Sequence, residues 1–204
     1  MKNVFTRCAI LLAVFFINYG MQAQLATWNF DGEVTAPSSS AMDVVADPAV
    51  FSRGLGTTSF PAGNSSTDSY STNNWSTDTA FDDTKFLQIS LSADECNLLE
   101  IRGFDFDERR SGTGVLSFFV EVYYTLADGS TGTTTVMTGT VPDDIDWRSQ
   151  SSPLSLDCTQ ATFRIYGFDA EATGGTWRFD NISIAGSVIP SDTNAPVVSL
   201  SPIP

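Results

Sequence analysis

Three aromatic residues in polar segments are the side chains best suited to binding a ligand. Tyr70, Trp75 and Trp147 each lie among Ser, Asn, Asp or Arg residues. An exposed ring of this kind can stack on a sugar while neighbouring polar groups bind the sugar hydroxyls. The sequence therefore predicts a glycan-binding surface that contains these rings. The alternative is that each ring closes an edge of the hydrophobic core.

A second group of candidates is acidic. A glycosidase needs two carboxylates about 5–10 Å apart across a cleft, and one sequence does not show which acids face each other. Acids in an aspartate-rich chain also serve as solvated turn residues or as ligands of Ca²⁺, which prefers several hard oxygens. We therefore predict that the protein is not an enzyme and keep a carboxylate-based glycoside hydrolase as an alternative. The acids concerned are Asp105, Asp107, Glu108, Asp143, Asp144 and Asp146.

Several common catalytic sites are excluded by composition. The sequence has no histidine, and Lys85 is the one lysine after residue 2. A Ser-His-Asp triad, a Cys-His pair and a histidine-based zinc site are therefore impossible, and no Schiff-base pocket is evident.

The N-terminus reads as a secretory signal peptide over residues 1–23. Lys2 and Arg7 supply the positive charge, and residues 9–17 supply a short apolar run before a polar stretch. This run is shorter than the roughly 20 residues of a membrane-spanning helix, and no later segment is apolar enough to span a bilayer. We expect a secreted or cell-surface protein without membrane insertion. The alternative is a buried N-terminal helix.

Two cysteines, Cys96 and Cys158, follow the predicted signal. In an exported protein an isolated pair predicts one disulfide bond. Two free buried thiols are the alternative.

The charge balance limits the partners. Ten Lys and Arg residues stand against 24 Asp and Glu residues, for a formal net charge of −14. Such a surface repels phosphate backbones and anionic membranes, so we expect no nucleic-acid partner.

Strand signals dominate residues 24–186. Leu116, Phe118, Val120 and Val122 alternate with Ser117, Phe119, Glu121 and Tyr123, and the turn at residues 127–130 then predicts a hairpin. Further strands are predicted without any helix, which favours an all-β, antiparallel two-sheet sandwich. The apolar phase slips at Arg102–Gly103 and at Asp180–Asn181, as a β-bulge produces.

Residues 187–204 differ in composition from the residues that precede them. They are rich in Pro and Ser and read as a linker that enters a further β domain near Ala195. We therefore expect downstream domains of a longer chain as partners of the sandwich domain.

Both ends of the predicted domain carry the same tetrad pattern. Trp28-Asn29-Phe30-Asp31 opens it and Trp177-Arg178-Phe179-Asp180 closes it, while residues 109–114 are followed by a long strand and Asp128-Gly129-Ser130. In these features the chain resembles galactose-binding-like jelly-roll domains. This group includes many carbohydrate-binding modules and N-terminal domains of large secreted proteins of Bacteroidetes-type bacteria. The resemblance implies a jelly roll whose first and last strands are neighbours, with the Trp and Phe residues sealing the core.

The resemblance also implies a structural Ca²⁺ where those two strands meet. The matching positions are Asp31, Glu33 and Asp180, although Asn181 stands where a second Asp is usual. Together these features predict a non-catalytic binding or adhesion module directed to a polysaccharide or surface glycan. The alternative from another class is a purely structural spacer domain.

Overall fold

The computed structural model describes residues 23–47 and 57–191. Residues 1–22 of the predicted signal and residues 192–204 of the predicted linker lie outside this range. Within it, no helix is both long and apolar enough to cross a membrane. The strands are β1 (Gln24–Trp28), β2 (Ser39–Ser40), β3 (Val44–Asp47), β4 (Thr58–Ser59), β5 (Tyr70–Thr72), β6 (Phe86–Ala93), β7 (Asn97–Arg110), β8 (Ser117–Thr125), β9 (Thr131–Thr140), β10 (Arg148–Cys158), β11 (Gln160–Phe168) and β12 (Trp177–Pro190).

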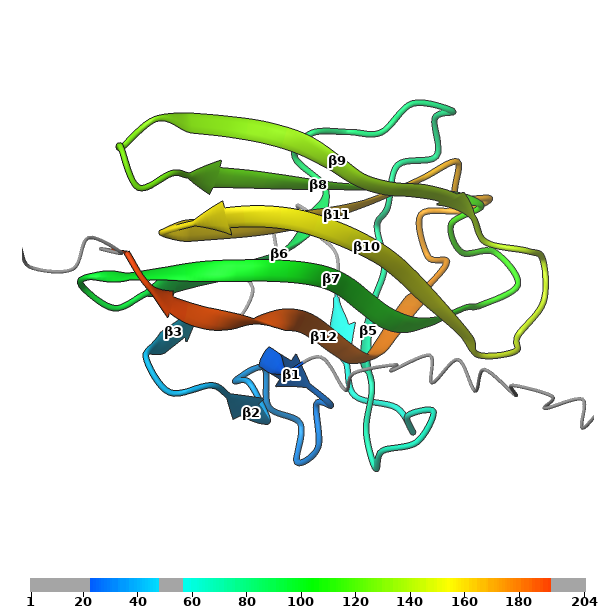
Figure 1. The fold of residues 1–204 in the computed structure, drawn as a ribbon. Helices are drawn as coiled ribbons and strands as arrows, with labels where there is room; N and C mark the ends of the chain where they lie inside the picture. Colours follow the sequence, from blue (N-terminus) through cyan, green and yellow to red (C-terminus); the bar gives the residue numbers. More distant parts are fainter. Residues whose placement is uncertain (1–22, 48–56, 192–204) are drawn as a thin grey trace, which may run out of the picture.

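The strands form two antiparallel sheets (Figure 1). A seven-stranded sheet has the order β10-β7-β12-β1-β2, with β5 paired to β12 and β4 to β5. A five-stranded sheet has the order β3-β6-β11-β8-β9. The long strands thus run β1-β12-β7-β10 in one sheet and β6-β11-β8-β9 in the other, so the chain crosses repeatedly between sheets. This is the double Greek key of a jelly roll, and it confirms the predicted fold class.

The first and last strands lie side by side, as predicted. β1 pairs antiparallel with β12, and Trp28 is the partner of Ile182. Trp28, Phe30, Trp177 and Phe179 are all at most 3 % exposed. The matching tetrads therefore place their aromatic rings in the core where the chain enters and leaves the domain.

The inner faces of the two sheets meet through aromatic rings. Phe104 of β7 stacks on Phe163 of β11, with ring centroids 4.7 Å apart and planes 8° apart. Phe106 of the same strand packs edge-on against Phe118 of β8 at 5.9 Å. Burying such large rings supplies most of the apolar area that holds a sandwich together.

Both predicted phase slips are β-bulges. The β7–β12 register shifts between Asp180 and Ser183, where Asn181 has a φ of 47°. It shifts again between Ala185 and Gly186, which pair with Gly103 and Ile101 and so leave Arg102 without a paired residue. Each bulge returns the following apolar residues to the inner face, which explains the change of phase in the sequence.

The seven-stranded sheet extends past residue 186, where the sequence predicted the start of a linker. β12 continues to Pro190, which pairs with Asn97 at the start of β7. The Ser and Pro content of this segment suggested a linker, but the partner strand β7 is long enough to hold it in the sheet.

The predicted disulfide is also wrong: Cys96 and Cys158 are free thiols. Cys158 ends β10 opposite Leu99 of β7, whereas Cys96 lies three residues before Leu99. At about 3.3 Å per residue this offset is about 10 Å, more than the roughly 7 Å that a disulfide can span between Cα atoms. Cys158 is buried, and burial raises the pKa of its thiol to about 12, so it stays protonated.

Candidate functional site

Two of the three predicted sugar-stacking rings belong to the core. Trp75 is fully buried and packs edge-on against Trp177 at 5.5 Å, while its Nε1 donates to the carbonyl of Thr72 at 3.2 Å. Tyr70 is 1 % exposed, and its hydroxyl lies 2.9 Å from that of Thr58. Neither ring can stack on a ligand, so the prediction is wrong for both. Several of their polar sequence neighbours are buried with them, and the hydroxyls of Ser69 and Ser76 donate to backbone carbonyls.

Trp147 differs from these two rings. It directly precedes β10 and is partly exposed. It is therefore the one predicted ring that the structure leaves accessible.

The outer face of the five-stranded sheet carries an aromatic surface that we did not predict. Along β8, the side chains of Phe118, Val120 and Val122 are buried inside, whereas those of Phe119 and Tyr123 are partly exposed outside. Rings from β6, β11 and the loop before β6 join them there. We call this set the platform, and it consists of Phe81, Phe86, Phe119, Tyr123 and Tyr166.

The rings of the platform pack on one another. Phe81 stacks on Phe119 at 5.3 Å and tilts against Tyr166 at 5.0 Å. Phe119 and Tyr166 also stack, at 5.7 Å. Phe81 is still 46 % exposed, which is unusual for so large an apolar side chain. The platform is thus a packed layer with an accessible aromatic ring on top.

Arg164 of β11 packs against two rings of the platform. Its guanidinium carbon lies 4.4 Å from the ring centroid of Phe86 and 4.7 Å from that of Tyr123, within the range of a cation–π contact. Its Nε donates to the side-chain oxygen of Gln88 at 2.9 Å. Glu121 is its cross-strand partner on β8, but no ion pair within 4.0 Å joins Arg164 to any described acid. Its terminal nitrogens therefore keep donors for a ligand.

The hydroxyl of Tyr123 also remains a hydrogen-bonding group. It lies 3.2 Å from the hydroxyl of Tyr166. Burial, together with hydrogen bonds to Glu121 and Tyr166, raises the pKa of Tyr123. The phenol therefore stays neutral at physiological pH. Its proton is donated to Glu121, and its oxygen can still accept a hydrogen bond.

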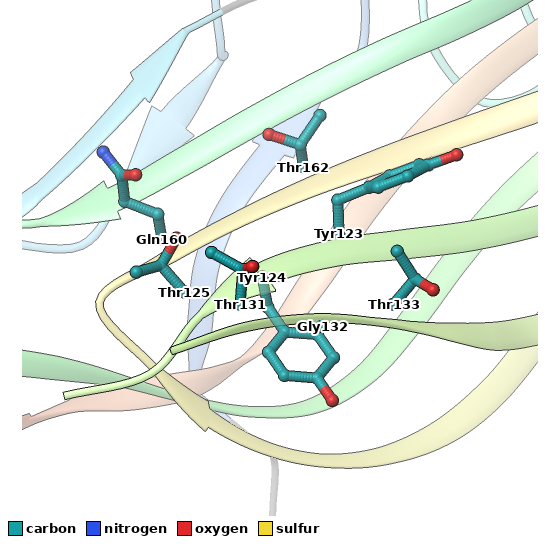
Figure 2. Close-up of a pocket in the computed structure, with 8 residues that line it drawn as sticks. All are labelled: Tyr123, Tyr124, Thr125, Thr131, Gly132, Thr133, Gln160 and Thr162. Atoms are coloured by element: carbon teal, nitrogen blue, oxygen red, sulfur yellow. The ribbon is translucent and has the colours of Figure 1, made fainter. Parts of the chain in front are cut away.

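Two adjoining hollows lie beside the platform, toward the turn that joins β8 to β9. Their volumes are about 360 and 350 Å³, and both are lined by Gln160 and Thr162. Figure 2 shows the first hollow, where Tyr123 and its neighbour Tyr124 point to opposite sides of β8. Its lining combines hydroxyl and amide groups with a larger apolar surface, and none of its residues is acidic. The lining consists of Tyr123, Tyr124, Thr125, Thr131, Gly132, Thr133, Gln160 and Thr162.

The acids considered for hydrolysis lie away from the two hollows, and several have partners within the protein. Glu108 lies inside the sandwich and accepts from Trp177 Nε1 at 3.0 Å. Asp143 pairs with Arg110 at 2.7 Å. Asp107 accepts from Ser149 at 2.5 Å on the outer face of the other sheet. None of the six acids lines either hollow.

The predicted calcium ligands do not form one site. Asp180 is buried, and its carboxylate accepts from the backbone N–H of Asn64 at 2.6 Å and from the hydroxyl of Ser66 at 2.9 Å. Asp31 instead accepts from the backbone of Thr67 at 2.7 Å, and Glu33 is exposed. In the part of the chain that the structure describes, no three His, Cys, Asp or Glu side chains are grouped to hold a metal. The predicted set therefore does not fit, and calcium binding itself stays a prediction.

A signal for the platform is present in the sequence. In the strand 117–125, both alternating faces carry aromatic residues, since Phe119 and Tyr123 lie opposite in phase to Phe118 and Tyr124. A strand with only one face in a core alternates apolar with polar residues. Aromatic residues on the second face therefore indicate a covered or functional outer surface.

Comparison with known proteins finds likeness only in fold. No family model matches the chain, and no curated protein matches it. A xylan-binding CBM22 domain of Paenibacillus barcinonensis Xyn10C is similar at 14 % identity and a TM-score of 0.48, over 81 % of this chain and 95 % of that one. The C-terminal family 22 carbohydrate-binding module of Clostridium thermocellum Xyn10B has 13 % identity and a TM-score of 0.48, over 81 % and 96 %. A cleaved adhesin domain of Porphyromonas gingivalis Lys-gingipain has 12 % identity and a TM-score of 0.44, over 79 % and 97 %.

Proposed function

We propose that the chain is a secreted or cell-surface module that binds a polysaccharide or surface glycan without catalysis, through the outer face of its five-stranded sheet. The observation that carries this proposal is Arg164, whose guanidinium contacts the rings of Phe86 and Tyr123 beside two hollows that contain hydroxyl groups. A charged donor on an aromatic layer, with hydroxyl groups around it, matches the mixed apolar and polar surface of a sugar.

In this proposal the platform provides stacking and the polar groups provide direction. The accessible ring of Phe81 packs against an apolar sugar face, while Arg164, Tyr123 and Gln88 bind hydroxyls. Because the ring contacts and the hydrogen bond to Gln88 already order these side chains, little conformational entropy is lost on binding. The two hollows lie beside the platform, and this extended surface suits a chain of several sugars better than a single one.

The spacer alternative has one observation in its favour, the burial of Tyr70 and Trp75. A spacer has no use for an exposed, stacked ring such as Phe81 or for an arginine that pairs with none of the described acids. The hydrolase alternative requires two facing carboxylates, and no acid lines the two hollows. Binding without catalysis therefore accounts for more of the outer face than either alternative.

The test is affinity electrophoresis of the mature domain against a panel of soluble polysaccharides. Phe81→Ala and Tyr123→Ala should each reduce the retardation given by the bound polysaccharide at least about tenfold. Both variants should keep the fold, as measured by thermal melting. Ile145→Ala is the matched control, because Ile145 is exposed and apolar but lies on a loop away from the platform. If no member of a broad panel retards the wild type, the spacer function is correct.

Export is tested separately by N-terminal sequencing of the protein recovered outside the cytoplasm. We expect the mature chain to begin near Gln24, which is the first residue of β1. Recovery of an intact Met1 terminus from the cytoplasm would contradict secretion.

A further inference from the structure

The outer face of the seven-stranded sheet contains two arginines directly opposite each other. Arg109 of β7 and Arg178 of β12 are Cα partners in the antiparallel register. Their neighbours Arg110 and Trp177 are buried inside, so the two partly exposed guanidinium groups share the outer face. Like charges at directly opposite positions destabilise a sheet.

No acid in the described part of the chain neutralises this pair. Lys85, Arg102, Arg110 and Arg148 all form ion pairs with carboxylates. Arg109 and Arg178 form neither an ion pair nor a side-chain hydrogen bond with residues 23–47 or 57–191, although the chain has 24 acids. Burial, and then the charge of Arg109, lower the pKa of Arg178. Two arginines that no described acid neutralises, in so acidic a protein, are in place for an anion from outside the described residues.

The neighbours of the pair point to the kind of anion. On β10, Arg148 is the partner of Glu108, and continuing this register by one residue brings the partly exposed Trp147 opposite Arg109. On the other side, Ser71 of β5 is the partner of Arg178 but is itself buried. An aromatic ring just before β10 and two guanidinium forks on β7 and β12 thus follow one another across the sheet.

We propose that Arg109 and Arg178 bind the carboxylate of an acidic sugar, a uronate, whose ring packs against Trp147. Guanidinium groups bind carboxylates through paired, parallel N–H donors, and two adjacent forks can hold both oxygens. The ligand carries isolated carboxylates, because the net charge of −14 repels a polyanion over longer range. This site lies on the opposite sheet from the platform and rests on the proposed function only in that its ligand is also a glycan.

The test is NMR titration of the folded domain with glucuronate, with glucose and acetate as matched probes. We expect glucuronate to shift the Nε–H signals of Arg109 and Arg178 and the indole signal of Trp147. Arg178→Gln should weaken glucuronate binding at least about tenfold, and Arg178→Lys should restore only part of it, because lysine keeps the charge without the fork. Trp147→Ala should weaken glucuronate binding while leaving the much weaker acetate binding unchanged.

Three outcomes overturn the proposal. These are no shift at either arginine, equal binding of glucose, or acetate binding as tight as that of glucuronate. Tyr123→Ala separates this site from the platform, because it should abolish retention on neutral polysaccharide and leave the glucuronate titration unchanged. Failure of the two proposals is therefore distinguishable.

Discussion

Arg110 and Arg164 lie in two different regions of the molecule, and their guanidinium groups have opposite kinds of surroundings. At the end of the sandwich, the guanidinium of Arg110 is fully buried and pairs with Asp143 and Glu171 at 2.7 and 2.5 Å. It also donates to the carbonyls of Ser111, Gly112 and Val115. On the outer face of the five-stranded sheet, Arg164 lies between two rings and donates to Gln88.

The difference separates a structural charge from an available one. The donors of Arg110 are used within the protein, where they tie together the loops that follow β7, β9 and β11. The charge of Arg164 is ordered but not neutralised, which is the condition for binding a ligand without first breaking an internal contact. The two arginines thus differ both in burial and in the identity of their partners.

The largest expected effect separates the core rings from the platform. Trp75→Ala should reduce the free energy of unfolding by about 3–5 kcal/mol, because it leaves a large cavity in the core. Phe81→Ala should cost less than about 1.5 kcal/mol, since Phe81 is half exposed and its removal leaves no closed cavity. Urea unfolding of both variants measures the two values. Equal losses would remove the distinction between core and platform.

Arg110 and Arg164 give the next largest difference. Arg110→Met should cost about 3 kcal/mol, because each buried carbonyl left without a donor costs about 1–3 kcal/mol. Arg164→Met should cost at most about 1 kcal/mol and should instead abolish retention on the polysaccharide. Urea unfolding and affinity electrophoresis are measured on both variants. Loss of binding in a stably folded Arg110→Met variant would contradict the assignment of a purely structural charge.

The buried carboxyl of Glu108 should make the stability of the protein depend on pH. Burial raises the pKa of Glu108 above 4.5, although Trp177 Nε1 and Arg148 oppose the rise. The folded state therefore holds the proton more tightly than the unfolded state, so stability should fall as pH rises from 4.5 through the folded-state pKa. Glu108→Gln should flatten this part of the profile, because the amide oxygen can still accept from Trp177.

The control for this experiment is Glu33→Gln, a change at an exposed carboxyl. Its melting temperatures from pH 4 to 8 should follow those of the wild type to within about 2 °C, which corresponds to less than about 1 kcal/mol. A Glu108→Gln profile parallel to the wild type would show that Glu108 does not contribute to the pH dependence.

The smallest expected effect is that of calcium. The carboxylate of Asp180 already accepts from Asn64 and Ser66, and Glu33 does not join it. Adding calcium or a chelator should therefore shift the melting temperature by less than about 2 °C, or less than about 1 kcal/mol. A larger rise with calcium that Asp180→Asn abolishes would instead support the calcium site implied by the family resemblance.

Much of the fold was predictable because its signals are local. Alternation along residues 115–126, the turn after it and the two phase slips each depend on a few neighbouring residues, and the structure has a strand, a hairpin and two bulges there. The pairing of the first and last strands was predictable only through the resemblance at Trp28 and Trp177. The position at which β12 ends was not predictable, because the long β7 keeps a Ser- and Pro-containing segment in the sheet.

The candidate site was predicted poorly because exposure is not a local property. The sequence by itself determined the alternation of polar and apolar residues along each strand. It also determined the absence of histidine-based catalytic sites and the strongly acidic charge. Only the tertiary structure decided that Trp75 lies against Trp177, and that Phe119, Arg164 and Tyr166 meet on one outer face. The physical reason is that period-two alternation separates two faces of a strand, whereas the pairing of strands distant in sequence decides which rings are covered.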